Sequence, residues 1–322
     1  MRSGILLQCP VKRDDTHAAA YAGLQAEVTA AEAYGFDTCW LSEGHGVPRF
    51  CGVPAPLLML ASLTSITTRI GLGTAAVLVP YYRPDRLVEQ AAMIDCLSNG
   101  RLRLGIGDRK ASAGRGRSAG PPGGRDLMQE ILDTMDACWR RGEGDEPDRF
   151  PHPVQERAPL HVVCNSPTTA AWAARRSRPI ILTSMNHGLS ETLLDMVGLY
   201  RRNAARDGSG SPGVSIVFAC YVSESEADLR GTLLGSLSEY LETTGGRGPA
   251  ADYLFGSVIA GSKAACRRQI AYVASVTGAD ELVFWFNPGG LIPRERVFAS
   301  MASVGEILNE LKIADRGGWR AA

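Results

Sequence analysis

The sequence has little of what marks several large classes of protein. Its 34 basic and 34 acidic side chains cancel, so it offers no basic field to nucleic acid or to an anionic membrane surface. No apolar run approaches the roughly 20 residues that a membrane-spanning helix needs, and the N-terminus carries no apolar targeting segment. We therefore expect a soluble, cytoplasmic protein with no nucleic-acid or membrane partner.

Patterns for metal binding and for disulfide bonds are also missing. The eight cysteines lie far apart, mostly within apolar runs, and none forms a C-x-x-C pair. This distribution is typical of reduced cysteines in a protein core rather than of a disulfide or zinc framework. The five histidines show no i,i+3 or i,i+4 spacing, so we expect no metal site.

One nucleotide-binding motif is present, but in the wrong context. The stretch "GLGTAA" at 71–76 matches the G-x-G-x-x-A fingerprint of dinucleotide-binding folds. That fingerprint requires a helix directly after the glycine turn, whereas here the apolar run continues and Pro80 and Pro84 precede any helix. The motif therefore predicts part of a strand and no nicotinamide site.

What the sequence does contain is one rhythm repeated eight times. Short, nearly continuous apolar runs alternate with segments of helical periodicity, and such runs are typical of parallel strands buried on both faces. Eight alternations favour a closed (β/α)8 TIM barrel with loop insertions over an open sheet, with residues 1–322 as a single domain. The expected strands are 4–9, 36–42, 69–79, 101–107, 160–166, 179–184, 214–223 and 281–287.

Three segments are too long for the tight connections of a minimal barrel. They are the glycine-rich stretch 108–124, the polar, proline-rich stretch 141–158, and 243–262. Loops of this length inside a compact domain are usually functional or disordered. We expect either 108–124 or 243–262 to act as a lid over an active site.

Two polar stretches follow predicted strands, at the end of the barrel where active sites lie. In "WLSEGHGVP", Glu43 and His45 stand two residues apart among glycines. In "CNSPTT", Ser166 is placed to cap a helix that starts at Pro167, and the free N–H groups of such a helix, with nearby hydroxyls, form an anion site. Plain helix capping is the alternative account of Ser166 and Thr169.

Several stretches together resemble the bacterial luciferase-like flavin monooxygenase family. They are "AEAYGFDTCWLSEGHG", "TTRIGLGTAAVLVPYYRPDRLVEQAAMIDCLSNGRLRLGIG", "VVCNSPTTAAWAA" and the C-terminal "SKAACRRQIAYVASVTGADELVFWF". The likeness covers most of the chain, and residues 69–107 carry its most specific part. Members of that family are (β/α)8 barrels, usually dimeric, that bind reduced flavin at the carboxyl ends of the strands.

The resemblance implies which positions bind the flavin. The peptide bond at 75–76, cis in the family, would lie against the flavin ring, and Gly107 would leave room for the ring. The phosphate would meet the start of the helix at 167 together with an arginine. The implied cofactor-binding residues are Ala75, Ala76, Gly107, Arg125, Asn165, Ser166 and Thr169.

The chain departs from the family at one catalytic position. Family members often carry Glu-His-His where this chain has Glu43-Gly44-His45, with the first histidine as acid or base. Three interpretations stay open. His45, with Glu43, serves in proton transfer; or the pair is structural; or the chain is a non-catalytic flavin-binding partner subunit.

The resemblance also implies a reaction and its partners. The chain would use reduced FMN and molecular oxygen to oxygenate a small aldehyde, aromatic or polyketide-like substrate, as in secondary metabolism. A separate reductase would supply the reduced flavin, and the enzyme would be a homodimer. A deazaflavin-dependent oxidoreductase of the same superfamily is the alternative. The expected lining of an apolar substrate chamber is Cys9, Trp40, Tyr221, Trp285 and Phe286.

Overall fold

The computed structural model describes residues 1–12, 15–46, 48–108, 124–139, 151–206, 213–246, 248–254 and 256–316. Within these ranges nine parallel strands pair in the order β6-β5-β4-β3-β2-β1-β9-β7-β8, and an additional pairing of β6 with β7 closes the sheet. All strands but β8 therefore form an eight-stranded barrel, and the fold expected from the sequence is confirmed. The strands are β1 (Arg2–Leu7), β2 (Thr38–Leu41), β3 (Gly71–Leu78), β4 (Leu102–Gly107), β5 (Leu160–Val163), β6 (Ile180–Thr183), β7 (Val214–Val222), β8 (Val258–Gly261) and β9 (Glu281–Trp285).

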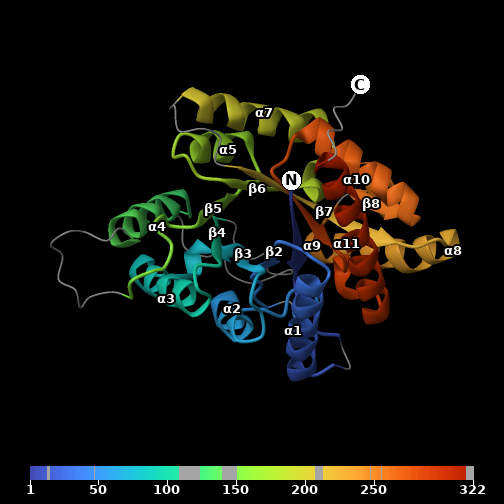
Figure 1. The fold of residues 1–322 in the computed structure, drawn as a ribbon, viewed down its shortest axis with the longest axis horizontal. Coiled ribbons are helices and arrows are strands. Elements are labelled where there is room, and N and C mark those ends of the chain that lie inside the picture. The colour runs from blue at the N-terminus through green and yellow to red at the C-terminus, as the bar shows by residue number, and fades with distance from the viewer. Residues whose placement is uncertain are drawn as a thin grey trace.

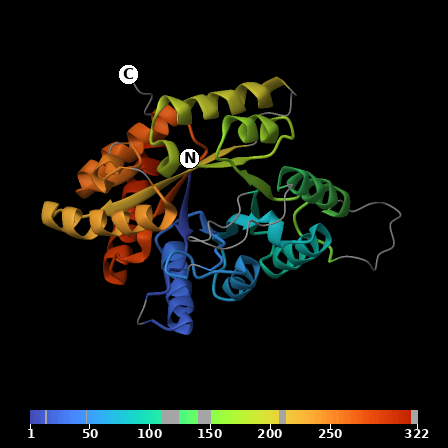
Figure 2. The same cartoon turned by 180° about the vertical axis from the view of Figure 1, so that it is seen from behind.

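Helices surround the barrel on its outside (Figure 1; seen from behind in Figure 2). The helix α1 and the last helix α11 lie side by side next to the first strand. The helices are α1 (His17–Ala33), α2 (Pro56–Thr64), α3 (Pro84–Leu97), α4 (Gly124–Trp139), α5 (Pro167–Ala174), α6 (Ser184–His187), α7 (Glu191–Arg206), α8 (Glu226–Asp228), α9 (Leu234–Thr244), α10 (Lys263–Thr277) and α11 (Arg294–Arg316). The short 3-10 helices are η1 (Val79–Tyr81), η3 (Ala250–Leu254) and η4 (Pro288–Gly290), and η2 (Leu229–Leu233) is a π-helical segment.

The starts of the helices follow local chemistry in the sequence. The Thr16 hydroxyl accepts a hydrogen bond from the Ala19 N–H at 3.1 Å and so caps α1. Proline stands at the first position of α2, α3 and α5, where its missing N–H has no helical partner to lose. These caps fix the residue at which each of these helices begins.

The large side chain of Trp40 packs inside the barrel, edge-on against the buried ring of His161. Trp40 is 1% exposed, and its ring occupies the space that side chains at Gly4 and Gly73 would need, since an added Cβ there would lie 3.1 Å and 2.5 Å from it. The indole N–H of Trp40 donates to the Glu281 carboxylate at 3.4 Å, which also accepts from the Ser215 hydroxyl at 2.6 Å. Packing here closes the floor beneath the cavity described below.

The segment 243–262 differs from the expectation of one long loop. Helix α9 runs into it as far as Thr244, η3 lies in its middle, and β8 pairs with the second half of β7, from Ala219 to Val222. The apolar run "VIAG" is too short to stand out in the sequence, yet it continues the sheet because β7 is nine residues long. Helix α10 follows β8 and is also additional to the eight predicted pairs.

The other sequence expectations for loops have different outcomes. The motif at 71–76 lies inside β3, as its context predicted. Residues 109–123 and 140–150, which make up most of the two other long loops, lie outside the described residues. Of the helices that the structure describes, none combines the length and the apolar character that crossing a membrane requires.

Candidate active site

A cavity of about 480 Å³ opens at the carboxyl ends of the strands. All eight barrel strands, or the residues directly after them, contribute to its wall, and on several strands every second residue faces it, as in a closed parallel barrel. Barrel enzymes carry their active sites at this end. The lining residues on these strands, or within two positions after them, include Leu6, Gln8, Ser42, Ala75, Ala76, Leu78, Gly107, Val163, Asn165, Ile181, Leu182, Thr183, Val217 and Trp285.

Glu43, directly after β2, is buried in this wall and fully hydrogen-bonded. Its Oε2 accepts from the Leu78 N–H at 2.9 Å and from the Tyr82 hydroxyl at 3.0 Å. Burial raises the pKa of the Glu43 carboxyl above its ordinary value, although these hydrogen bonds oppose the rise. Burial and the Glu43 charge likewise raise the pKa of Tyr82, which keeps its hydroxyl proton as the donor.

His45 is held by the other oxygen of the same carboxylate. Its Nε2 lies 2.6 Å from Glu43 Oε1, and its ring stacks on Tyr81 with centroids 4.1 Å apart. The side chain is 29% exposed and lines the cavity. If Nε2 donates to Glu43, Nδ1 of the neutral ring is an acceptor. Such a carboxylate–imidazole pair has the geometry of a general acid or base with its orienting group.

Gly44 has no room for a side chain. An added Cβ would lie 2.4 Å from the Cβ and 2.9 Å from the Sγ of Cys51. Cys51 is 2% exposed, and its thiol donates to the Ser42 carbonyl at 3.4 Å. A side chain at position 44, where the resemblance implies a histidine in many family members, would therefore overlap Cys51 from the following loop.

Small residues at the end of β3 form part of the cavity wall. The peptide bond between Ala75 and Ala76 is cis, as the resemblance implied, and the pairing of β3 with β4 shifts register between Thr74 and Val77. Gly107 stands next to it, and an added Cβ there would lie 3.2 Å from the Ala76 Cβ. Small residues thus leave this wall open to a planar group.

The residues expected at the phosphate are only partly brought together. Asn165 lines the cavity and accepts a hydrogen bond from Asn186 at 2.9 Å. The Ser166 hydroxyl accepts from the Thr169 N–H at 3.2 Å and contacts its hydroxyl at 3.0 Å, which caps α5. Ser166 and Thr169 lie outside the cavity lining, and Arg125 is exposed near the start of α4.

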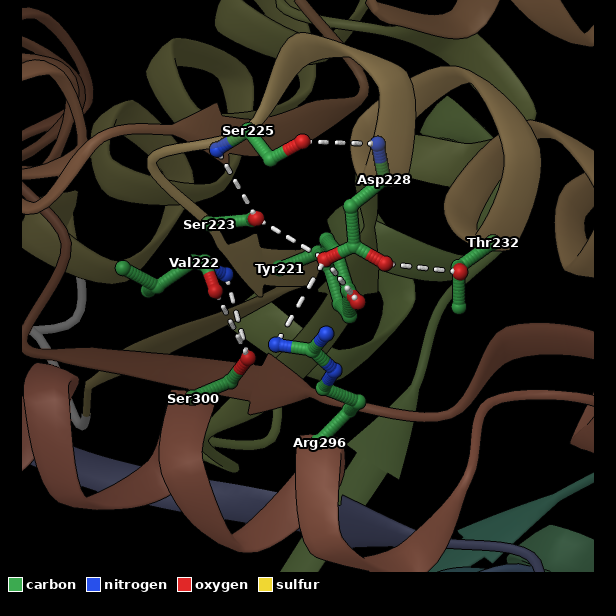
Figure 3. A network of polar contacts seen from close by, with 8 residues as sticks. All are labelled: Tyr221, Val222, Ser223, Ser225, Asp228, Thr232, Arg296 and Ser300. Atoms are coloured by element: carbon green, nitrogen blue, oxygen red, sulfur yellow. Dashed lines mark hydrogen bonds and ion pairs between the residues drawn. The ribbon is translucent and has the colours of Figure 1, made fainter.

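Of the five residues expected in a substrate chamber, Trp285 lines the main cavity. Cys9 and Phe286 line a second cavity instead. The expectation is wrong for Trp40, which fills the barrel floor, and for Tyr221, whose hydroxyl donates to Asp228 at 2.8 Å. Figure 3 shows Tyr221 in a polar network that joins the end of β7 to α11, where Asp228 also accepts from Ser223 and Thr232.

Several lining residues escaped the sequence interpretation. They are Gln8, Ser42, Phe50, Thr183, Asn186, Tyr240 and Tyr253. Counting every second residue along each predicted strand would have found Gln8, Ser42 and Thr183. Tyr240 and Tyr253 come from α9 and η3, whose approach to the barrel has no local signal. Among the described residues no group of three or more His, Cys, Asp or Glu side chains is arranged to hold a metal ion.

Comparisons with known proteins agree with this geometry. Residues 1–279 match the family model described as luciferase-like monooxygenase. The alkanal monooxygenase alpha chain of the Kryptophanaron alfredi symbiont is 32% identical over 52% of this chain and 50% of its own length. The oxygenase component of the flavin-dependent trigonelline monooxygenase of Acinetobacter baylyi is 26% identical over 62% of this chain and 58% of its own. The matches thus span about half to three fifths of these relatives.

Solved structures of similar fold include oxygenases and an F420-dependent enzyme. Monooxygenase RslO1 from Streptomyces bottropensis superposes with a TM-score of 0.80 at 20% identity, over 97% of this chain and all of the other. The oxygenating constituent of 3,6-diketocamphane monooxygenase from Pseudomonas putida, in complex with FMN, gives 0.76 at 18% over 95% and 97%. An F420-dependent secondary alcohol dehydrogenase gives 0.72 at 14% over 95% and 97%. These likenesses concern the fold. Because the family model covers most of its length, the chain belongs to the luciferase-like monooxygenase family.

Proposed function

We propose that the chain is the oxygenase of a two-component system, which takes reduced FMN and molecular oxygen and oxygenates a small organic substrate. The observation that carries the proposal is the cavity itself. A carboxylate–imidazole pair, Glu43 and His45, forms one part of its wall, and the side-chain-poor backbone of Ala75, Ala76 and Gly107 forms another. One surface suits a planar ring, and the other suits proton transfer.

The flavin would be held in two parts. Its ring fits against the Ala75–Ala76 peptide and Gly107, where a Cβ would intrude. Its phosphate arm would run past Asn165 to Ser166 and Thr169 at the start of α5, with Arg125 as the cation. When bound, reduced FMN supplies the electrons that activate oxygen. The hydrogen bond that caps α5 at Ser166 would then be shared between the Ser166 hydroxyl and the phosphate.

His45 would exchange a proton with the reacting molecule at Nδ1. Glu43 orients the ring through Nε2, and Tyr82 and the Leu78 N–H in turn hold Glu43. Stacking on Tyr81 restrains the ring from the other side. This positioning replaces the family's first histidine, whose place Cys51 occupies.

The mouth of the cavity would close over the substrate. Tyr240, Thr244, Gly245 and Tyr253 line it, and Gly245 adopts a left-handed conformation at the end of α9. Because water exclusion protects reactive species, we propose this segment as the lid. Of the lining residues that the structure describes, Glu43 alone is a carboxylate and none is Lys or Arg, which favours an uncharged aldehyde, aromatic or polyketide-like substrate, as in secondary metabolism.

A homodimer and a separate reductase complete the proposal. Leu58 on α2 and Met93 and Leu97 on α3 are 75%, 53% and 58% exposed, and their helices pack together. Such an apolar face suits a second copy of the chain. Light scattering should therefore give twice the monomer mass. The reductase is supported by the missing nicotinamide motif and by the name "oxygenase component" of the trigonelline relative.

An F420-dependent oxidoreductase is the second candidate, because one structure of this fold is F420-dependent. Equilibrium dialysis of the purified chain against reduced FMN and reduced F420 under anaerobic conditions separates the two. We expect binding of FMN and loss of that binding in Gly107→Val, which fills the wall with a side chain. Binding of F420 without FMN would contradict the proposal. Non-catalytic flavin binding would appear as FMN binding without any oxygenated product.

The phosphate assignment has its own test. Arg125→Ala should weaken FMN affinity several-fold, and because Arg125 is exposed, the fold should not change. Ser166→Ala should also weaken it, but loses a helix cap worth about 1 kcal/mol. Unchanged affinity in Arg125→Ala would refute the assignment.

A further inference from the structure

A second cavity of about 240 Å³ lies beside the main one, between α1 and α11. Leu6, Gln8 and Trp285 line both cavities and so form a shared wall. The remaining wall combines apolar side chains, such as Leu24 from α1 and Val297 from α11, with polar and charged ones. Nothing in the proposed oxygenase reaction uses this space.

One carboxylate in this wall is poorly compensated. Glu27 lies on the buried face of α1, next to Leu24 and Val28, and its side chain is 17% exposed. Among the described residues no hydrogen bond to its carboxylate is formed, and its nearest cationic group is the Arg294 Nε at 4.0 Å. Burial raises the pKa of Glu27 to about 7. A carboxylate kept in such a place costs free energy unless a ligand or partner balances it.

The nearby cation, Arg294, also lines the cavity but is more exposed than Glu27. Arg294, the first residue of α11, is 51% exposed. Its guanidinium crosses α1 at Gly23, where an added Cβ would lie 1.9 Å from Nη2. Lys12 and Asp15, the other charged lining residues, are also exposed. Glu27 is therefore the buried charge of the cavity. The exposed charges at its rim, on Lys12, Asp15 and Arg294, partly cancel one another.

We propose that this second cavity binds a small organic ammonium with an apolar body, with Glu27 as its counter-ion. The buried rings of Trp285 and Phe286 in the wall suit both an apolar body and a cation. An engineered cavity of about 150 Å³ holds benzene, so this one has room for an aromatic ring with a short amine-bearing arm. The inference stands on this cavity alone and goes beyond the oxygenase reaction.

An occupant here would touch the wall of the main cavity. Trp285 belongs to both cavities and contacts Tyr240 edge-on, with ring centroids 4.9 Å apart. Tyr240 lies in the mouth of the main cavity. A ligand in the second cavity would therefore affect the wall of the main cavity through the indole ring of Trp285. The fluorescence of this ring also gives a signal for binding.

The test uses three probes of similar size and different charge: phenylethylammonium, 2-phenylethanol and phenylacetate. Isothermal titration into the full chain at about pH 8, where Glu27 is ionised, should detect the ammonium with a Kd below about 1 mM. Glu27→Gln should weaken it at least about tenfold, while Glu130→Gln, the same change on the exposed face of α4, should not. The ammonium should also change the fluorescence of Trp285, and Trp285→Phe should lack that change.

Proton release gives a second readout. Near pH 7 the ammonium should displace the proton of Glu27, so the binding heat should depend on the ionisation heat of the buffer. The other ionisable side chains that line the cavity are Cys9, Lys12, Asp15 and Arg294. Tighter binding of phenylacetate would assign the site to Arg294 and Lys12 and overturn the proposal. Equal affinity in Glu27→Gln, or no binding of any probe, would also overturn it.

Discussion

Cys51 fills the space that a side chain at position 44 would need, with its Cβ 2.4 Å from where the Cβ of a residue other than glycine would stand. This contact leaves no room for a histidine at position 44, and we propose that His45 takes the acid or base role instead. Glycine at position 44 is therefore required by the packing of the loop that carries Cys51.

The contact predicts the result of restoring the family's residue. Gly44→His alone should destabilise the fold by about 1–3 kcal/mol through overpacking, measured as the free energy of unfolding in urea. Adding Cys51→Gly should recover part of this loss, because the two sites are coupled. Cys138→Ala, at a half-buried cysteine distant from the cavity lining, is the control and should give no recovery. A Gly44→His variant as stable as the parent would contradict the contact.

Replacing His45 separates a catalytic role from a structural one. His45→Ala should lower the oxygenation rate by about 10²–10⁴-fold, with FMN affinity unchanged within about twofold, because the ring wall at Ala75, Ala76 and Gly107 is intact. Stopped-flow turnover and FMN titration measure the two effects. An unchanged rate would leave the pair with a structural role only.

Tyr82 should act through Glu43 as a positioning residue. Tyr82→Phe removes a hydrogen bond that lowers the pKa of Glu43, so the rate should fall about tenfold and the acid limb of the pH–rate profile should move to higher pH. In the His45→Ala background the same change should have little further effect, since both act in one chain of contacts. A full additional loss there would place Tyr82 in another role.

The raised pKa of Glu27 predicts that the stability of the fold decreases as pH rises. Because its pKa is raised to about 7 in the fold, the native state binds the proton more tightly, and the free energy of unfolding falls as pH rises from about 4.5 to about 7. Glu27→Gln should be more stable than the parent above about pH 7, by up to about 3 kcal/mol, and similar to it near pH 4.5. Thermal unfolding at both pH values checks this. A variant less stable at high pH would show that Arg294 already balances the charge.

The lowered pKa of Asp228 predicts the opposite pH dependence of stability. Desolvation raises the pKa of the Asp228 carboxyl, but hydrogen bonds from Ser223, Thr232 and Tyr221 lower this pKa below its ordinary value (Figure 3). Asp228→Asn should therefore cost about 1–3 kcal/mol at neutral pH, and the difference from the parent should shrink below about pH 4. A loss that does not depend on pH would point to shape rather than charge.

Much of the fold was predictable because it depends on local signals. Apolar runs gave the eight barrel strands, and Ser166 marked a helix start that the structure confirms. Strand β8 was missed because four apolar residues resemble a loop until β7 extends far enough to pair with them.

The site was less predictable, because it depends on contacts between distant segments. The spacing of Glu43 and His45 indicated a pair, and the structure brings them to 2.6 Å. Nothing local shows that Cys51 would fill the place of a residue at 44, or that Tyr82 would reach Glu43 across 39 positions of sequence. Trp40 was misjudged because an aromatic side chain at a strand end suits the barrel floor as well as the cavity.

The central claim is that this chain uses reduced FMN and molecular oxygen to oxygenate a small uncharged substrate. The most direct measurement supplies the chain with reduced FMN from a separate reductase, isotope-labelled O2 and a panel of aldehydes and aromatic compounds, and follows the products by mass spectrometry. We expect a product that carries one labelled oxygen atom and is absent without the chain. Substrate turnover without oxygen on reduced F420, or no labelled product from any member of the panel, would contradict it.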